Sequence, residues 1–211
     1  MTPRGTFIAF EGGEGTGKST QARLLAEALA ARGIDALVTR EPGGTPGAEA
    51  IRALLLDGPQ WGPQAEALLF AAARADHVAR AILPALEAGR WVICDRFVDS
   101  SRAYQGGAGA LGDTAIMDLH MIGSLGLIPD RTILMEVDAD VAAARLAARD
   151  CGRADNIAGR GEAYHAAVAA AFVRFAEADP QSFVRIDGNG TAAQAHGAVL
   201  AALEPFIAAR A

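Results

Sequence analysis

Lysine is almost absent from this chain of 211 residues. Of its 19 basic residues, Lys18 is the single lysine and the other 18 are arginines. Cysteine is also scarce, and the two copies, Cys94 and Cys151, are too few for a disulfide framework. Cys94 lies in an apolar run and is predicted to be a core residue, while Cys151 has no neighbour with which to form a metal site.

Positive net charge and long apolar runs are lacking as well. The net charge is −6 and the pI is near 5.2, which argues against a general nucleic-acid-binding protein but leaves room for a local basic pocket. No apolar run is long enough to span a membrane, and we expect no signal peptide. With 51% hydrophobic residues the composition is not that of a disordered chain. We therefore expect a cytoplasmic enzyme with no membrane or nucleic-acid partner.

The single lysine lies in a glycine-rich segment, Gly12–Ser19, that fits the phosphate-binding loop pattern Gly-x4-Gly-Lys-Ser/Thr. An apolar run before it is typical of a buried strand, and leucines recur after it at helical spacing, which argues against a chance match in a glycine-rich chain. In such a unit, backbone N–H groups and a helix N-terminus hold phosphates, Lys18 reaches the β- and γ-phosphates, and the Ser19 hydroxyl holds magnesium. The residues predicted to bind the nucleotide phosphates are Gly12, Gly13, Glu14, Gly15, Thr16, Gly17, Lys18, Ser19 and Thr20.

Short apolar runs alternate with longer helical patterns along the whole chain. The strand-like runs are Phe7–Phe10, Ala36–Thr39, Trp91–Asp95, Thr132–Val137 and Phe183–Ile186. The helical patterns begin near Lys18, Gly47, Pro63, Asp113, Asp140, Glu162 and Thr191. This alternation predicts an α/β fold in which a doubly wound, five-stranded parallel sheet carries helices on both faces, as one domain over residues 1–211. Such sheets bind ligands at the carboxyl ends of their strands.

Three features interrupt this pattern. Pro84 falls inside the helical stretch Ala65–Ala88 and is expected to kink or split that helix. The glycine-rich segments Gln105–Gly112 and Asp150–Gly161 are predicted to be irregular. The second has arginines around a polar stretch, which is typical of a mobile lid, although a surface loop has the same composition.

Polar residues follow the third predicted strand. Asp95 ends that strand, where an acidic residue can organise magnesium beside a phosphate loop. Arg96 comes next, and a guanidinium suits bidentate phosphate contact better than an ammonium does. A structural ion pair between Asp95 and Arg96 is the alternative. Further hydrogen-bonding side chains, suited to sugar or base edges, are Ser100, Ser101, Tyr104 and Gln105.

Two other segments carry candidate binding residues. Arg40 follows the second strand in a turn rich in proline and glycine, which would hold it near the same strand ends unless it is an ordinary surface arginine. Phe70 and Arg74 are four residues apart on one helix face, so a ring could stack on a base while a guanidinium bonds the base edge. Taken alone, the pair fits a core Phe70 and a surface Arg74 better. No chemistry is assigned to the scattered histidines, which are His77, His120, His165 and His196.

Together these segments resemble the bacterial thymidylate kinase family, from about Phe7 to Asp187. The segments that carry the resemblance are Glu11–Thr20, Thr39–Thr45, Leu68–Arg74, Asp95–Phe97, Ala103–Gly106 and Pro129–Asp130. The phosphate loop alone is shared by many enzymes, but these segments occur together, in order and at these separations. The resemblance implies a P-loop kinase fold with a short lid at about residues 149–161. It also implies a homodimer, for which Ala65–Leu86 could supply the apolar face.

The resemblance implies magnesium-dependent phosphoryl transfer from ATP to dTMP, which gives dTDP on the route to dTTP. Phe70 would stack on thymine, and Arg74 would hydrogen-bond its edge. Arg96 would hold the dTMP phosphate with Arg40 nearby, and Glu14 would lie near the sugar 3′-hydroxyl. The nucleoside pocket would also be lined by Ser101, Tyr104 and Gln105. Magnesium would be held by Ser19 and, through a bound water, by Asp95.

The lid is where the chain departs from the family it resembles. Family members that lack an arginine at the variable positions of the phosphate loop supply a catalytic arginine from the lid, and this loop has none. They often carry Asp-Arg-Phe/Ile-Glu there, whereas this chain has Asp155-Asn156-Ile157-Ala158. Arg149, Arg153 or Arg160 must then substitute, with Arg153 or Arg149 preferred, or transfer is slower.

The predicted catalytic residues are therefore Lys18, Asp95, Arg96, Arg149 and Arg153. Two other functions stay open. One is a kinase for a different nucleoside monophosphate or for a deoxynucleoside. The other is a catalytically weak nucleotide-binding paralogue, which the altered lid would explain. A GTPase is disfavoured because the guanine-binding motif Asn-Lys-x-Asp needs a second lysine.

Overall fold

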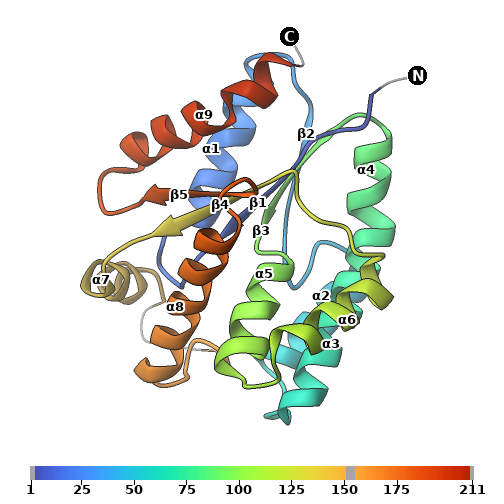
Figure 1. The fold of residues 1–211 in the computed structure, drawn as a ribbon, viewed down its shortest axis with the longest axis vertical. Helices are drawn as coiled ribbons and strands as arrows, with labels where there is room; N and C mark the ends of the chain where they lie inside the picture. The colour runs from blue at the N-terminus through green and yellow to red at the C-terminus, as the bar shows by residue number, and fades with distance from the viewer. Residues whose placement is uncertain (1–2, 151–154, 210–211) are drawn as a thin grey trace.

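The computed structural model describes residues 3–150 and 155–209, without the side chains of residues 149 and 150. Five parallel strands form one sheet in the order β2-β3-β1-β4-β5 (Figure 1). They are β1 Phe7–Glu11, β2 Ala36–Arg40, β3 Trp91–Asp95, β4 Arg131–Glu136 and β5 Phe183–Asp187. The predicted five-stranded parallel sheet is confirmed, and each predicted strand end lies within one residue of the observed end.

Helices connect these strands and cover both faces of the sheet. They are α1 Lys18–Ala30, α2 Pro46–Leu56, α3 Pro63–His77, α4 Leu83–Glu87, α5 Val98–Ser101, α6 Asp113–Ser124, α7 Ala139–Asp150, α8 Glu162–Ala178 and α9 Ala192–Ala208. Caps explain two of the starts. The Thr45 hydroxyl accepts a hydrogen bond from the Ala48 N–H before α2, and Thr191 forms a reciprocal capping box with Gln194 before α9.

Alternate residues of β1 enter two different cores. Ile8 and Phe10 pack with residues of α1 and α9. These two helices cover one face of the sheet (Figure 1). Phe7 and Ala9 pack on the other face, against the stretch of chain that runs from α3 to α4. All four side chains are fully buried, and full burial of a phenylalanine or isoleucine side chain contributes about 1.5–3 kcal/mol. Helices on both faces therefore explain why the strand is apolar from Phe7 to Phe10.

The predicted break at Pro84 is present in the structure. A π-helical segment, Val78–Ile82, separates α3 from α4, and Pro84 lies in the first turn of α4. Proline has no N–H to donate to the carbonyl four residues earlier, so the regular hydrogen-bond pattern cannot continue through it.

The prediction that Gln105–Gly112 is irregular is wrong for its first half. A π-helical segment, Arg102–Ala108, continues from α5, so the irregular part begins at Gly109. The glycines of this segment serve close packing rather than a loop. A Cβ added to Gly106 would lie 3.2 Å from Ile116 Cγ1 of α6 and 3.3 Å from the Gly112 carbonyl oxygen, so this glycine allows a close approach.

Cys94 and His120 are both buried side chains. Cys94 is fully buried in the sheet, as predicted for a core residue, and Cys151 lies outside the described residues. His120 is buried, with its Nε2 2.8 Å from the Leu127 carbonyl oxygen.

Over residues 3–150 and 155–209 there is no group of three or more His, Cys, Asp or Glu side chains placed to hold a metal ion. The same residues contain no helix long and apolar enough to cross a membrane.

Candidate functional site

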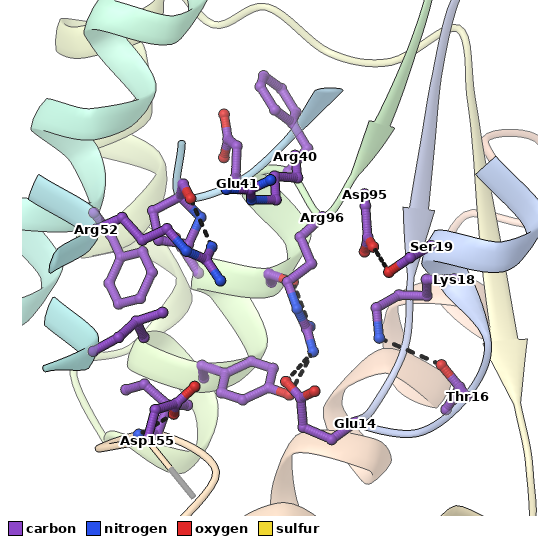
Figure 2. Close-up of a pocket in the computed structure, with 18 of the residues that line it drawn as sticks. Glu14, Thr16, Lys18, Ser19, Arg40, Glu41, Arg52, Asp95, Arg96 and Asp155 are labelled. Carbon is purple, nitrogen blue, oxygen red and sulfur yellow. Dashed lines mark hydrogen bonds and ion pairs between the residues drawn. The ribbon is translucent and has the colours of Figure 1, made fainter. Parts of the chain in front are cut away.

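A cavity of about 560 Å³ opens at the carboxyl ends of β1, β2 and β3 (Figure 2). Because β3 lies between β1 and β2, the loops that follow these three strands meet at one edge of the sheet. The predicted site residues that line the cavity are Glu14, Gly15, Thr16, Gly17, Lys18, Ser19, Thr20, Arg40, Phe70, Arg74, Asp95, Arg96, Ser101, Tyr104 and Gln105. Residues far apart in the sequence are thus brought together as expected.

The phosphate loop depends on glycine where its backbone turns back on itself. Gly12, Gly15 and Gly17 have φ angles of 135°, 73° and 93°, a region that other residues rarely adopt. A Cβ on Gly15 would lie 2.6 Å from the carbonyl oxygen of Ala142, so α7 packs directly against the loop. Gly17 is followed immediately by α1, so the N-terminus of that helix faces the cavity.

Lys18 is buried and turned back onto its own loop. Its Nζ donates to the Gly13 carbonyl at 2.5 Å and to the Gly12 carbonyl at 3.1 Å. Burial, followed by the nearby positive charge of Arg96, lowers the pKa of Lys18 from 10.5 to about 8. The ammonium is therefore poorly compensated in the protein alone, and a phosphate would supply the negative charge that it lacks.

Two oxygen-bearing side chains lie where magnesium is expected. The Ser19 hydroxyl donates a short hydrogen bond to the Asp95 carboxylate at the end of β3 (Figure 2). Hydroxyl and carboxylate oxygens are the kind of ligand that magnesium prefers. Two protein oxygens leave most of an octahedral shell to phosphates and water, as is usual for magnesium beside a nucleotide. The residues present therefore fit this ion.

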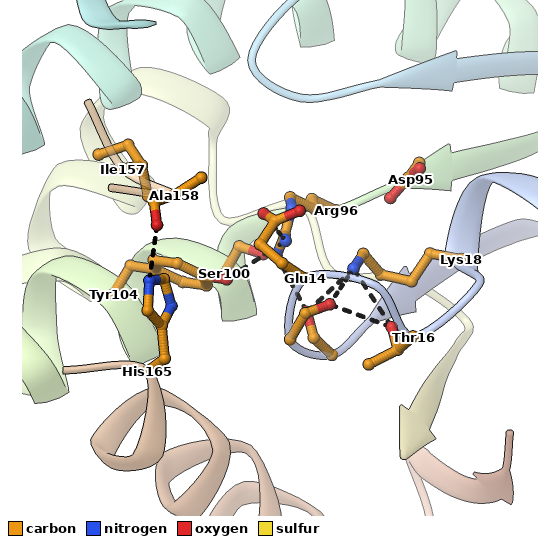
Figure 3. A network of polar contacts seen from close by, with 12 residues as sticks. Glu14, Thr16, Lys18, Asp95, Arg96, Ser100, Tyr104, Ile157, Ala158 and His165 are labelled. Carbon is orange, nitrogen blue, oxygen red and sulfur yellow. Dashed lines mark hydrogen bonds and ion pairs between the residues drawn. The ribbon is translucent and has the colours of Figure 1, made fainter. Parts of the chain in front are cut away.

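The Arg96 guanidinium forms a network at the centre of the cavity (Figure 3). It donates to Glu14 Oε1 at 2.6 Å, to Ser100 Oγ at 3.0 Å and to the Tyr104 hydroxyl at 3.2 Å. The ion pair of Arg96 is thus with Glu14, while Asp95 accepts from Ser19. The alternative of a structural Asp95–Arg96 pair is not what the geometry shows, and Arg96 extends across the cavity toward the phosphate loop.

Arg96 itself stands in a strained turn. Its φ of 70° lies in the left-handed region, which costs a residue with a side chain about 1–3 kcal/mol. The buried Glu11 carboxylate holds this turn, because it accepts the N–H of Phe97 at 2.8 Å and the N–H of Ser100 at 3.0 Å. Burial, followed by the charge of Asp99, raises the pKa of Glu11 to about 7. Sequence reasoning did not single out Glu11, although a carboxylate at the end of an apolar strand was a usable signal.

The far end of the cavity presents an aromatic ring and a fixed guanidinium. Phe70 is half-buried, packs against the core beneath α8, and also lines the cavity. Arg74 is buried rather than a surface cation, so that alternative is wrong. It donates to the Glu41 carboxylate at 2.7 Å and to Ser101 Oγ at 2.9 Å.

Glu41 was missed as a functional residue, although it follows Arg40 directly. Its carboxylate is buried and lies between the Arg74 guanidinium and His77 Nδ1, which is 3.2 Å away. His77 Nε2 in turn lies 2.7 Å from the Thr39 hydroxyl. This chain of contacts orients Arg74. It joins the end of β2 to α3, and no local sequence pattern shows that these two segments meet.

A further arginine, Arg52 of α2, reaches the cavity and was also missed. It donates to the Pro42 carbonyl at 2.8 Å, and burial lowers its pKa, with the charge of Arg40 adding to the effect. Arg40 is more exposed and pairs with Glu49 at 3.1 Å. Figure 2 shows Arg40, Arg52 and Arg96 around one space, which makes this part of the cavity suited to an anion.

The lid contains arginines with different surroundings. Arg160 donates to the Glu66 carboxylate and, at 2.6 Å, to the Tyr164 hydroxyl, and it does not line the cavity. It is therefore unsuited to replace the missing lid arginine. The side chain of Arg149 and the whole of Arg153 lie outside the described residues. Asn156, at the position of that arginine, instead donates to the Gly58 carbonyl at 3.0 Å and to the Leu55 carbonyl at 3.3 Å.

One more arginine lines the cavity beside the phosphate loop. Arg145 of α7 donates to the carbonyl of Gly188 at 2.8 Å. This contact ties α7 to the loop that follows β5. Sequence reasoning missed Arg145 because α7 carries two arginines and nothing local distinguishes one from the other.

Comparison with known proteins gives a consistent family. A family model described as thymidylate kinase matches residues 10–199. A thymidylate kinase of Rhizorhabdus wittichii is 56% identical over 96% of this chain and 99% of its own length, and one of Gluconobacter oxydans is 49% identical over 96% of each chain. The crystal structure of the thymidylate kinase of Ehrlichia chaffeensis superposes with a TM-score of 0.77 at 32% identity, over 96% of this chain and all of that one. The resemblance noted from the motifs is confirmed, and the chain belongs to the thymidylate kinase family.

Proposed function

We propose that this chain transfers the γ-phosphoryl group of ATP to dTMP, which gives dTDP and ADP. Membership of the thymidylate kinase family supports this reaction and does not favour another nucleotide kinase or a silent paralogue. The structural observation that carries the proposal is a single cavity that joins a phosphate loop to a recess lined by Phe70, Arg74 and Tyr104. A donor and an acceptor bound in one cavity can react directly, so the protein contributes position and charge rather than covalent chemistry.

The donor is held at the phosphate loop. The amides of Gly12–Ser19 and the Lys18 ammonium bind the donor phosphates, and Lys18 exchanges its carbonyl partners for phosphate oxygens. Ser19 directly and Asp95 through water hold magnesium, which neutralises charge on the donor phosphates.

The acceptor is held by the other half of the cavity. Arg96 binds the dTMP phosphate, with Arg40 and Arg52 beside it. Phe70 stacks on thymine, Arg74 donates to the base edge, and the side chains that complete the pocket are Glu14 at the sugar 3′-hydroxyl, Ser101, Tyr104 and Gln105. Because Glu41 and Ser101 fix Arg74 before substrate arrives, little ordering is left to occur on binding.

An arginine of the lid completes the site. We assign this role to Arg153 or Arg149, because Arg160 is paired with Glu66. The assigned arginine would stabilise charge on the transferring group. Residues 149–161 would act as the lid of one kinase domain that spans residues 1–211. Closure of such a lid excludes water and so limits hydrolysis of ATP.

We also propose a homodimer that works in the cytoplasm. Exposed apolar side chains occur on α3, on α6 and directly after α6, where Leu68 is 56%, Met121 57%, Ile122 80% and Leu125 78% exposed. The two helices pack against each other, and we propose that these side chains together form one apolar surface. Burial against a second copy would remove that surface from water. The expected face, Ala65–Leu86, contributes only in part, since most of the surface belongs to α6.

The proposal is tested by steady-state transfer from ATP and magnesium to dTMP, dUMP, UMP, CMP, AMP, GMP and thymidine. A strong preference for dTMP supports both the reaction and the Phe70–Arg74 pocket. Preference for another monophosphate would keep the kinase class but contradict the pocket, and an absence of transfer to every acceptor would contradict the reaction.

A further inference from the structure

The C-terminal end of α2 receives hydrogen bonds from a distant part of the chain. An α-helix leaves its last four carbonyl groups without partners inside the helix. Asn156 lies 98 residues beyond Gly58, and its Nδ2 donates to the Gly58 carbonyl at 3.0 Å and to the Leu55 carbonyl at 3.3 Å. Its backbone N–H donates to the Leu56 carbonyl at 3.2 Å. One residue of the proposed lid thus caps the end of this helix.

The residues on either side of Asn156 belong to the wall of the main cavity. Asp155 and Ile157 both line it, as does Leu56 of α2 (Figure 2). Ile157 is buried in an apolar cluster against which Leu56 packs. The Asp155 carboxylate accepts the N–H groups of Ile157 and Ala158, both at 2.8 Å, which fixes the local turn. The contacts of Asn156 therefore hold two cavity-lining segments together.

The same segment is attached to α3 at its other end. The Arg160 guanidinium donates to the buried Glu66 carboxylate, which also accepts from Gln105 Nε2 at 2.9 Å. The helices α2 and α3 pack against each other. Residues 155–160 are thus held on these two helices by contacts between protein atoms alone. The same α2 carries Arg52, which we assign beside the dTMP phosphate.

We propose that Asn156 is a positioning residue: by capping α2, it fixes residues 155–158 as a wall on the acceptor side of the cavity. An amide suits this role because its NH2 group donates two hydrogen bonds, whereas a carboxylate of the same shape only accepts. Carbonyls at a helix C-terminus also carry partial negative charge, which disfavours a carboxylate there. Because protein contacts set this wall, dTMP does not have to order it on binding. The inference rests on the proposed dTMP kinase function and concerns how this chain holds the acceptor.

Steady-state kinetics of Asn156→Ala test the consequence for the acceptor. Without the side-chain bonds, residues 155–158 leave α2 part of the time, and only the docked fraction binds dTMP well. We expect the KM for dTMP to rise by about 3- to 10-fold, while kcat and the KM for ATP stay within about 2-fold. Asn156→Asp should raise the KM for dTMP further, because it replaces the donor by a negatively charged acceptor of the same shape.

Hydrogen–deuterium exchange tests the docking itself, independently of any activity. Mass spectrometry of a peptide that covers residues 155–161 measures how often its N–H groups open to solvent. The peptide should exchange at least about 3-fold faster in Asn156→Ala than in the wild type, because the turn that holds the N–H groups of Ile157 and Ala158 is no longer fixed on α2.

Trp61→Phe is the matched control. The indole N–H of Trp61 donates to the Leu54 carbonyl at 3.0 Å, so it caps the same helix end from within the neighbouring turn. Its loss removes one hydrogen bond from that end and leaves the contacts of Asn156 in place. This variant should keep the wild-type KM for dTMP and the wild-type exchange rate of the 155–161 peptide.

Three outcomes would overturn the inference: a KM for dTMP in Asn156→Ala equal to that of the wild type, equal exchange of the 155–161 peptide in these two proteins, or a rise in KM in Trp61→Phe as large as in Asn156→Ala. None of these would contradict the kinase reaction itself. Failure of the wild type to phosphorylate dTMP would contradict the reaction instead. Thermal unfolding of each variant, followed by circular dichroism, confirms that the compared proteins are folded at the assay temperature.

Discussion

Replacement of Lys18 by methionine is predicted to abolish phosphoryl transfer and at the same time to make the ligand-free protein more stable. The ammonium is buried in a loop built to hold phosphates, and its hydrogen-bond acceptors there, the Gly12 and Gly13 carbonyls and the Thr16 hydroxyl, are all uncharged. Methionine keeps a similar length and volume and carries no charge to desolvate. The same residue therefore opposes folding and is required for the reaction.

The size of the effect follows from the pKa of Lys18. Burial, together with the charge of Arg96, lowers that pKa from 10.5 to about 8, a fall of about 2.5 units. At 1.36 kcal/mol per unit, the charged form is disfavoured by roughly 3 kcal/mol at neutral pH. Lys18→Met also gives up hydrogen bonds worth about 1 kcal/mol each. With the two shorter bonds lost, we expect the free energy of unfolding to rise by about 1 kcal/mol at pH 7.

The pH dependence provides an internal check on the cause. Because the pKa of Lys18 is lower in the folded protein, the unfolded chain binds more protons between about pH 8 and 10.5. The stability of the wild type therefore rises across that window, and the advantage of Lys18→Met should fall to zero or below, because the lost hydrogen bonds then outweigh the remaining charge penalty. Urea unfolding at pH 7 and at pH 10, followed by circular dichroism, measures both differences. A variant less stable than the wild type at pH 7, or a difference that does not change with pH, would refute this account.

Three further predictions concern the acceptor pocket, the lid and the dimer. Phe70→Ala should raise the KM for dTMP by about 10- to 100-fold, the worth of one stacked base, and a KM that does not change in steady-state assays would remove Phe70 from the site. Arg153→Ala should lower kcat by a factor on the order of 10³, whereas Arg160→Ala should not; single-turnover assays compare them, and the reverse order would show that the lid is misassigned. Ile122→Arg should convert the proposed dimer to a monomer in light scattering, because Ile122 of α6 is 80% exposed and a charge there would oppose burial against a second copy, and an unchanged mass would place the interface elsewhere.

Features that depend on neighbours in the sequence could be predicted closely. The strand Phe7–Glu11, the loop Gly12–Ser19 and the start of α1 follow from an apolar run, glycine spacing and helical periodicity over about twenty residues. The position of Asp95 and Arg96 at a strand end followed in the same way, because a parallel sheet brings the carboxyl ends of its strands to one edge.

Features that depend on which side chains meet across the fold could not be predicted in this way. The Gln105–Gly112 segment is rich in glycine and was expected to be irregular, but its first half belongs to the π-helical segment Arg102–Ala108 that continues from α5. Arg160 has the composition of a lid arginine, yet a buried carboxylate of α3 holds it away from the cavity.

The sequence by itself thus determined the α/β fold, the phosphate loop and most residues that line the cavity, because local chemistry and strand order suffice for them. Tertiary structure alone decided that Glu41 orients Arg74, that Arg52 joins the anion-binding part of the cavity, and that Glu66 holds Gln105. The physical reason is that a hydrogen bond between buried groups requires both partners to lie within about 3 Å. Glu41 and Arg74 are 33 residues apart along the chain, and Glu66 and Gln105 are 39 apart. Nothing in the sequence around these residues shows that they meet.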